Sequence, residues 1–224
     1  MLQAIHQRLE AARRLTDGLR RLRLFSQAAA GTDPAGLPFE TRRLLVRDAG
    51  PADVDALHDY MVQEPFCRRE HLGRPSRAQI VTLLQYCQRQ QKAEVRSVYS
   101  LVAVLRESNA IIGHGRLRIL DRANREAKLA LGTDWRYGAQ GFETELGAGM
   151  LRFGFGSLGL HRIVAQCDVD DLATNRVFEK LGMRPEGVLR DNIHAEGRWW
   201  SSYQWSMLAP EHRTSNGTAE KRGA

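Results

Sequence analysis

The sequence predicts a single α/β (α+β) domain in which short strands alternate with helices, preceded by an amphipathic helix. Apolar residues make up 42% and charged residues 26% of the 224 residues, close to the average of globular proteins. From Phe39 onward the hydrophobic pattern alternates between the two-residue period of strands and the 3.6-residue period of helices. The length suits one sizeable core with an appendage, but hardly two full domains.

The elements of the domain follow from these periods and from the turn residues between them. Pro51 favours a helix start, and the sequence ESNA favours a turn between two strands. In chain order we expect a strand (40–49), two helices (51–62 and 77–90), a meander of three strands (97–105, 110–120 and 127–133), a glycine-rich loop, a helix ending near 158, a strand (161–169), a helix (174–181) and a hairpin (187–208).

The appendage is predicted at the N-terminus, where apolar residues recur at spacings of three and four with arginines around the other side. A linker is expected over residues 28–38. We therefore divide the chain into a helical extension with linker (1–37), a domain (38–209) and a polar tail (210–224) that we expect to be disordered. The helix is expected to pack on its own domain or to pair two subunits in a homodimer; an arm for nucleic acid or membrane is the alternative. Its apolar face is Leu2, Ile5, Leu9, Ala12, Leu15, Leu19 and Leu22.

The net charge of +7 favours anionic ligands, among which nucleic acid, phosphorylated cofactors and acidic membranes remain open. The three cysteines form no C-x-x-C pair, so no metal site is expected and a reduced, cytoplasmic location is predicted. No apolar run is long enough to span a bilayer. The Arg-rich start leaves a mitochondrial transit peptide open, although Glu10 and Asp17 argue against it.

The glycine-rich loop is a candidate anion site. Gly138, Ala139, Gln140 and Gly141 lie between a strand ending near Thr133 and a helix beginning near Phe142, so free backbone N–H groups collect at a helix N-terminus. Glycine there allows a phosphate to approach the backbone closely. An ordinary strand-to-helix turn is the alternative interpretation.

Four segments together resemble the RimJ/RimL-like branch of the GNAT-superfamily N-acyltransferases, over about Phe39 to Leu208. They are ETRRLLVRDAGPADVDAL, YGAQGFETE, FGSLGLHRIVAQCDVDDLATNRVFEKLGMRPEGVLR and EGRWWSSYQWSML. The resemblance implies the GNAT fold, a mixed and strongly bent sheet flanked by helices, with acyl-CoA in a splay between two parallel strands. It implies transfer of an acetyl or other short acyl group from acetyl-CoA, or another acyl-CoA, to a primary amine of a small molecule or peptide.

The resemblance also implies the cofactor-binding residues. The CoA pyrophosphate would bind the loop, Leu131 and Thr133 would offer backbone groups to the thioester, Asp171 would contact the pantetheine arm and Arg176 a phosphate. Glu143 stands where the family has Gly or Ala. A carboxylate there would repel a phosphate by about 1 kcal/mol at ~4 Å in water, unless it points outward and only stabilises the helix dipole. The loop residues concerned are Gly138, Ala139, Gln140, Gly141, Phe142 and Glu143.

The catalytic residues implied are a general acid and a general base. Thr174 occupies the position of the family's hydroxyl residue, which protonates the departing thiolate; a helix N-cap is its alternative role. The family's acidic base lies near residues 191–194, so Asp191 or His194 is expected to serve. The acceptor pocket is expected between the first two helices and the terminal hairpin, near Phe66, Cys67, Arg68, Arg69, His71, Trp199, Trp200 and Tyr203.

Two other functions remain open from the sequence. One is a binding or regulatory module on a degenerate GNAT fold, because Glu143 and Asp171 place acids where the family has neutral groups and Phe178 replaces a tyrosine that many GNAT enzymes use. The other is a transferase with a non-CoA donor such as aminoacyl-tRNA, suggested by the basic N-terminal arm.

Overall fold

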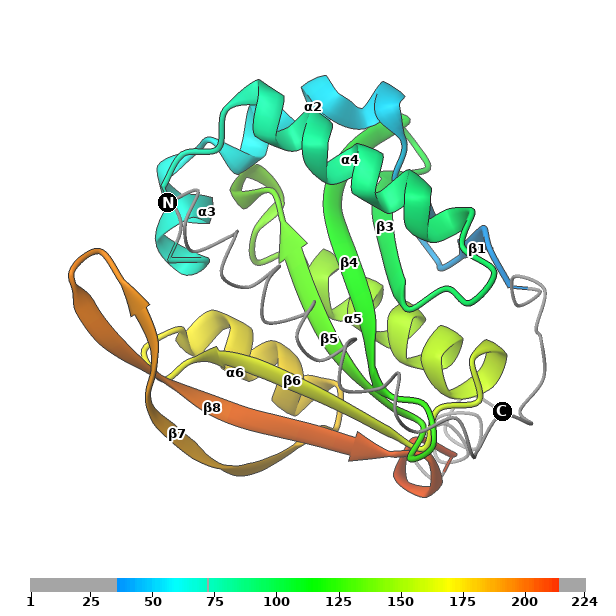
Figure 1. The fold of residues 1–224 in the computed structure, drawn as a ribbon, viewed down its shortest axis with the longest axis vertical. Coiled ribbons are helices and arrows are strands. Elements are labelled where there is room, and N and C mark those ends of the chain that lie inside the picture. The colour runs from blue at the N-terminus through cyan, green and yellow to red at the C-terminus, as the bar shows by residue number, and fades with distance from the viewer. Residues whose placement is uncertain (1–35, 72, 214–224) are drawn as a thin grey trace, which may run out of the picture. The chain divides into compact units, whose positions relative to one another are not determined.

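The computed structural model describes residues 36–71 and 73–213, which belong to the compact unit that begins at Thr32. Eight strands form one sheet in the order β1-β2-β3-β4-β5-β6-β8-β7 (Figure 1). The strands are β1 (Phe39–Glu40), β2 (Leu44–Asp48), β3 (Val98–Leu105), β4 (Ala110–Asp121), β5 (Glu126–Thr133), β6 (Arg162–Asp168), β7 (Arg184–Ala195) and β8 (Arg198–Leu208). The α-helices are α2 (Val54–Met61), α3 (Glu64–Arg69), α4 (Arg77–Gln91), α5 (Phe142–Arg152) and α6 (Leu172–Lys180).

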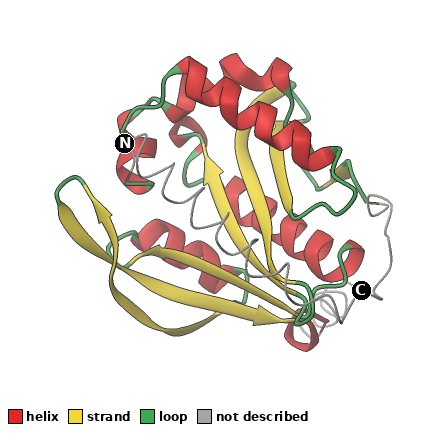
Figure 2. Cartoon of the chain, viewed as in Figure 1, coloured by secondary structure: helices red, strands yellow, loops and turns green. Residues whose placement is uncertain are grey.

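Different helices cover the two faces of this sheet (Figure 2). On one face α2 and α4 pack against β3 and β4 through a cluster that includes Leu57, Tyr60 and Leu84. On the other face α5 and α6 bury the larger cluster, with Leu146, Met150 and Phe178 among its members. Because β3 has helices on both faces, its sequence VYSLVAVL is apolar at nearly every position rather than at alternate ones. The predicted mixed sheet flanked by helices is confirmed.

One pair of neighbouring strands is parallel, β5 with β6, and all others are antiparallel. Their pairing begins at Glu126↔Arg162 and ends at Leu129↔Ala165. Beyond these residues β5 continues to Thr133 and β6 to Asp168 without pairing to each other. The two strands therefore diverge toward their carboxyl ends, which is the splay that the resemblance implies.

The local sequence explains where the helices begin. Ser76 and Gln79 form a reciprocal capping box at the start of α4. Pro51 opens a 3-10 turn, η1 (Pro51–Asp53), directly before α2. After α5 the helix continues with π geometry in η3 (Phe153–Ser157), in agreement with the predicted helix end near residue 158.

The structure differs from the sequence prediction in three places. The single strand expected over residues 40–49 is two strands, β1 and β2, which pair antiparallel with each other. The helix α3 was not expected as a separate element. Residues 210–213, expected to begin a disordered tail, lie in a helical turn, and Ala209 N donates to His161 O at 2.9 Å. The predicted amphipathic helix lies outside the described residues, and so does the expected linker up to residue 35. In the described part of the chain, no helix combines the length and apolar character needed to cross a membrane.

Candidate functional site

The loop after β5 presents backbone N–H groups at the N-terminus of α5. Ala139 and Gly141 have positive φ, 58° and 78°, which reverses the chain before the helix begins. The first backbone bond closing α5 runs from Glu145 N to Gly141 O at 3.0 Å. The N–H groups of residues 142–144 therefore have no acceptor within the helix, and they suit an anion such as a phosphate.

Arg43, at the start of β2, fixes this loop from outside the splay. Its Nε lies 2.6 Å from Glu145 Oε2 and its Nη1 donates to Gln140 O at 3.1 Å. Thr41 Oγ1 donates to Glu145 Oε1 at 2.6 Å. The backbone N–H of Arg43 donates to the same oxygen at 2.7 Å. Burial raises the pKa of Glu145, but these hydrogen bonds outweigh it and hold the pKa below its ordinary value. We call Thr41, Arg43, Gln140 and Glu145 the Arg43 clamp.

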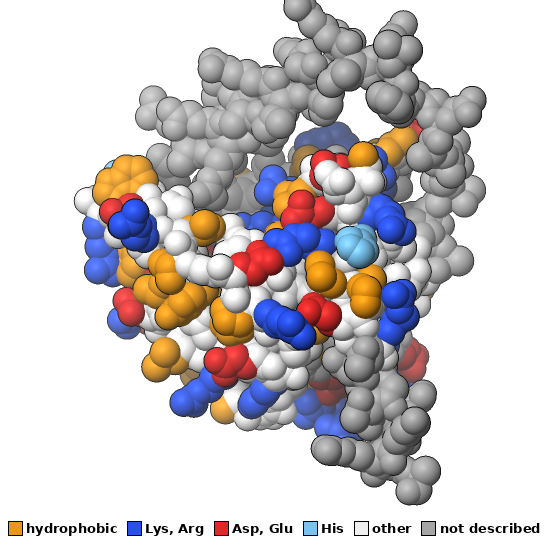
Figure 3. All heavy atoms as spheres, turned by 90° about the horizontal axis from the view of Figure 1, so that it is seen from below, with side chains coloured by type: hydrophobic (Ala, Val, Ile, Leu, Met, Phe, Trp, Pro, Cys, Tyr) orange, Lys and Arg blue, Asp and Glu red, His pale blue; other side chains and the backbone are white. Residues whose placement is uncertain are grey.

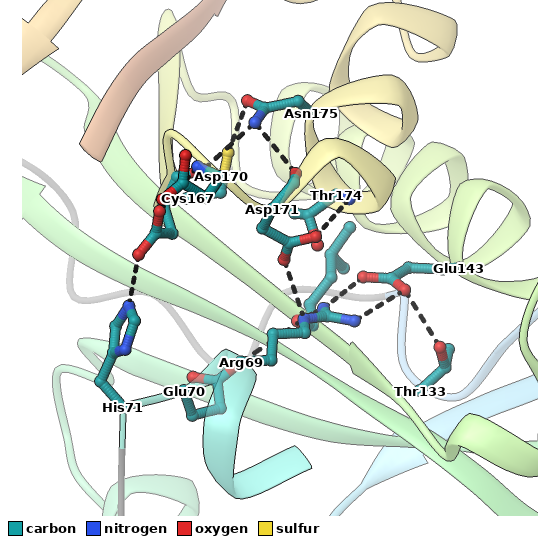
Figure 4. A network of polar contacts seen from close by, with 12 residues as sticks. Arg69, Glu70, His71, Thr133, Glu143, Cys167, Asp170, Asp171, Thr174 and Asn175 are labelled. Atoms are coloured by element: carbon teal, nitrogen blue, oxygen red, sulfur yellow. Dashed lines mark hydrogen bonds and ion pairs between the residues drawn. The ribbon is translucent and has the colours of Figure 1, made fainter. Parts of the chain in front are cut away.

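Glu143 points inward and is paired with Arg69, the last residue of α3 (Figure 4). Arg69 Nη2 and Nη1 donate to Glu143 Oε1 and Oε2 at 2.5 and 3.1 Å, and Thr133 Oγ1 donates to Oε2 at 3.0 Å. The Glu143 side chain is 14% exposed. Of the two alternatives for Glu143, the outward orientation is not the one observed; its charge is balanced by a bidentate guanidinium.

The same guanidinium reaches both walls of the splay. Arg69 Nη2 donates to Leu131 O at 2.8 Å, on the part of β5 that no longer pairs with β6, and Arg69 Nε lies 3.6 Å from Asp171 Oδ2 on the opposite wall. Burial lowers the pKa of Arg69, but Glu143 outweighs it, so the pKa is raised and the side chain stays charged. We call the contacts of Arg69 with Leu131, Glu143 and Asp171 the Arg69 bridge.

The opposite wall of the splay is the N-terminus of α6. Asp171 is the N-cap, because its Oδ1 accepts from Thr174 N at 3.0 Å. Thr174 therefore lies inside the first turn rather than at the cap, and its buried Oγ1 has no hydrogen-bond partner among the described residues. Asn175 joins α6 to the sheet, since its Oδ1 accepts from Trp205 Nε1 at 3.0 Å and from Cys167 Sγ at 2.9 Å. Arg176 is exposed.

The comparisons with known proteins agree with this architecture. A family profile described as "Acetyltransferase (GNAT) domain" matches residues 43–184. The chain belongs to the GNAT acetyltransferase family. An uncharacterized N-acetyltransferase of Bacillus subtilis (strain 168), YnaD, is 30% identical over 110 residues, which are 48% of this chain and 63% of that protein. The chain thus aligns with less than two thirds of the length of this relative.

Solved structures show the same fold. A spermidine N-acetyltransferase from Vibrio cholerae, solved in complex with CoA and spermine, has a TM-score of 0.68 at 17% identity, covering 77% of this chain and 99% of that one. A ribosomal-protein-S5-alanine acetyltransferase from Vibrio fischeri has a TM-score of 0.68 at 18% identity, covering 76% of this chain and 96% of that one.

The segment after α3 contacts β6 and the terminal hairpin. His71 Nε2 lies 2.7 Å from Asp168 Oδ2, and its ring centroid is 4.0 Å from that of Trp200. The structure thus joins His71 and Trp200, as expected for an acceptor pocket, but places Arg69 across the splay instead. Cys67 is buried and donates to Met61 O at 3.3 Å.

Two titratable residues beside the splay were missed from the sequence, Glu70 and His114. Burial raises the pKa of Glu70, opposed by Arg69 and Arg116, yet its side chain is 36% exposed and therefore reachable from solvent. His114 on β4 lies with Nδ1 2.7 Å from Tyr60 Oη, and burial lowers its pKa to about 3. His114 is therefore neutral, and a weak base, at neutral pH.

Asp191 and His194 both lie on β7, the edge strand of the sheet. Both are exposed; Asp191 N donates to Ser201 Oγ at 3.0 Å, and His194 packs on Trp199 with ring centroids 4.8 Å apart. In Figure 3 hydrophobic side chains gather on the side of the molecule where this hairpin lies, and Val188, Leu189 and Trp199 are 48%, 36% and 59% exposed. In the sheet order β8 and β6 lie between β7 and the splay.

Proposed function

We propose that this chain is an N-acetyltransferase that moves an acetyl or other short acyl group from acyl-CoA to a primary amine. The observation that carries the proposal is the divergence of β5 and β6 after Leu129, with the N-termini of α5 and α6 at its two walls. Family membership supports the proposal, and so does the fold neighbour that was solved with CoA and spermine. The fold neighbour named for ribosomal protein S5 supports a place in the RimJ/RimL-like branch.

The residues of the site suit an acyl-CoA donor in three respects. The N–H groups of residues 142–144 at the start of α5 would hold the pyrophosphate. In an extended strand the N–H and C=O of one residue point to the same side, so Leu131 N–H also faces the splay. Asp171 stands at the wall where the pantetheine arm would lie.

The chemistry requires two protons to leave the acceptor nitrogen, one from the ammonium before attack and one from the tetrahedral intermediate, and one proton to be supplied to the departing sulfur. The donor supplies a thioester carbonyl; an amide C–N bond forms and the C–S bond breaks. The backbone N–H of Leu131 would stabilise charge on the carbonyl oxygen. The Thr174 hydroxyl, which is buried and has no partner within the described chain, would give its proton to the leaving sulfur and regain one from the solvent.

Three residues are candidates for removing the proton from the acceptor ammonium. Asp191 and His194 remain predictions, and their position on the edge strand would require a water chain to the splay. Glu70 is our additional candidate, because it follows Arg69 directly, is accessible, and has a pKa that burial raises above its ordinary value. We expect Glu70→Gln to lower kcat/KM by about 10²-fold and to remove the acid limb of its pH profile. Glu64→Gln, at an exposed position of the same helix, is the matched control.

The test of the proposed function is release of free CoA from acetyl-CoA with a broad panel of amines, followed by mass spectrometry of the product. Transfer should require both substrates. Thr174→Val should lower kcat by about 10²-fold, while Thr174→Ser should retain most of it. No release with any amine or short acyl-CoA, together with no thermal shift by acetyl-CoA, would reject the proposal.

One observation favours a second function, a binding or regulatory module on this fold. The Arg69 bridge fills the splay with the protein's own charged groups. A crystal soaked with acetyl-CoA distinguishes the two functions, since density for the cofactor between β5 and β6 would exclude the second. A tRNA-dependent transferase, a homodimer formed by the N-terminal helix and a cytoplasmic location remain predictions from the sequence.

A further inference from the structure

The Arg69 bridge lies where the arm of a donor must pass. Beyond Leu129, β5 has a strand partner only on its β4 side, and its other side faces the splay. On that side Leu131 O already accepts from Arg69 Nη2 at 2.8 Å. The hydrogen bond that this carbonyl needs can come from a neighbouring strand, a ligand or a side chain, and here the side chain of Arg69 donates it.

Both walls contribute an acid to the bridge, so the arginine is held in place from two directions. The side chains of Glu143 and Asp171 are only 14% and 17% exposed. Thr133 Oγ1 orients the carboxylate of Glu143 toward Arg69 with a 3.0 Å hydrogen bond. Water screens the attraction in such pairs less than in surface pairs, and removal of one partner leaves the other charge largely buried and unpaired.

We infer that the Arg69 bridge determines the affinity of this site for its donor: acyl-CoA binds only to the fraction of molecules in which Arg69 has left Leu131 and the splay. The inference rests on the proposed function, because it takes acyl-CoA as the donor. When a ligand binds only one of two states, its apparent dissociation constant is the intrinsic constant divided by the fraction of molecules in that state. Arg69 is thus a specificity-determining residue whose side chain competes with the donor.

The test is the dissociation constant for acetyl-CoA, measured by isothermal titration calorimetry on the full chain. The double variant Arg69→Met/Glu143→Ala removes both members of the ion pair and restores a small residue at position 143, so no unbalanced charge remains between these two positions. We expect it to bind acetyl-CoA at least about tenfold more tightly than the wild type. The control is Arg77→Met/Asp55→Ala, which removes an exposed pair 2.9 Å apart from the helical layer and should leave the affinity unchanged.

Circular dichroism and thermal unfolding verify that each variant is folded. If the Met/Ala pair does not fold, Arg69→Gln/Glu143→Gln replaces it, since it removes both charges, keeps both side chains polar and keeps the volume at position 143. Equal or weaker binding by the double variant overturns the inference, and so does a lack of binding by every variant. Weaker binding would identify Arg69 as a ligand of the donor instead.

These outcomes are separate from those of the proposed function. Tighter binding by the double variant supports the inference even where the wild type transfers no acyl group. Conversely, acyl transfer by a wild type whose affinity equals that of the double variant supports the function and rejects the inference.

Discussion

The first turn of α5 holds two carboxylates, Glu143 and Glu145, and each is paired with an arginine from a distant part of the chain. The Arg43 clamp ties Glu145 to β2 and to the loop carbonyl of Gln140, outside the splay. The Arg69 bridge ties Glu143 to α3 and to both walls, inside the splay. An Arg–Glu ion pair thus fixes the binding loop at Arg43 and Glu145, whereas an ion pair of the same kind occupies the splay at Arg69 and Glu143.

The Arg43–Glu145 and Arg69–Glu143 ion pairs have the same chemistry, but their arginines lie in different kinds of structure. Arg43 directly precedes β2; its backbone O accepts from Arg106 N at 2.9 Å, and its own N–H donates to Glu145. Arg69 ends a helix of six residues. The clamp should therefore be a fixed part of the fold, whereas the bridge should be able to open.

The largest effect on stability is expected when one member of the bridge is removed. Arg69→Met should lower the free energy of unfolding by about 2–3 kcal/mol, because Glu143 is left largely buried without its counter-ion. Urea unfolding measures this, with Arg68→Met, at an exposed position of the same helix, as the control. Adding Glu143→Ala to Arg69→Met should recover part of the lost free energy of unfolding. If the loss in the double variant equals the sum of the losses in the two single variants, the two side chains are not coupled.

A somewhat smaller and pH-dependent effect is expected at the clamp. Glu145→Gln should cost about 2 kcal/mol at pH 7, because Glu145 accepts hydrogen bonds from Thr41 and Arg43. The pKa of Glu145 in the folded protein lies below its ordinary value of 4.5. Its contribution is therefore complete above that pH and is lost as the pH falls through the lower folded value.

Urea unfolding at pH 7 and at successively lower pH tests this sign. The difference between the wild type and Glu145→Gln should shrink below pH 4.5. The exposed Glu179→Gln should show no such trend. A difference that grows on acidification would contradict the assignment of Glu145 as a carboxylate stabilised in its charged form.

The smallest effect is expected in the loop itself. Gly141 has φ +78°, and a Cβ added there would meet nothing closer than Arg43 Nη2 at 3.8 Å. Gly141→Ala should therefore cost about 1 kcal/mol from backbone strain alone. Gly156→Ala, with no atom within 4 Å and no positive φ, is the control for thermal unfolding. If the clamp fixes the loop as described, Gly141→Ala should also weaken acetyl-CoA binding.

Much of the fold follows from the sequence, because the long strands and helices have clear periods. The helices α4 and α5 and the strands β3 to β6 lie within a few residues of their predicted positions. The helix α3 was missed since EPFCRR is too short to show a helical repeat. The anion site of the loop could be predicted because its free N–H groups depend only on a strand, two glycines and the start of a helix.

The charged groups of the site were less predictable, because their partners lie far away in the sequence. Glu143 was recognised as unusual, and a buried acid implies a nearby cation, but nothing in the sequence selects Arg69 over Arg68. Asp171 as the cap of α6 could have been predicted from its place three residues before Thr174. The roles of Asn175 and Glu70 depend on how β6, α6 and α3 meet.

Arg69 and His71 lie two residues apart, and they contact different partners. Arg69 contacts the walls of the splay, whereas His71 contacts Asp168 on β6 and Trp200 on β8. Because only Glu70 lies between them, a backbone shift that withdraws Arg69 would also shift His71. Under the proposed function, a donor that displaces Arg69 in this way would change the surroundings of His71, and steady-state kinetics should then show that the two substrates do not bind independently.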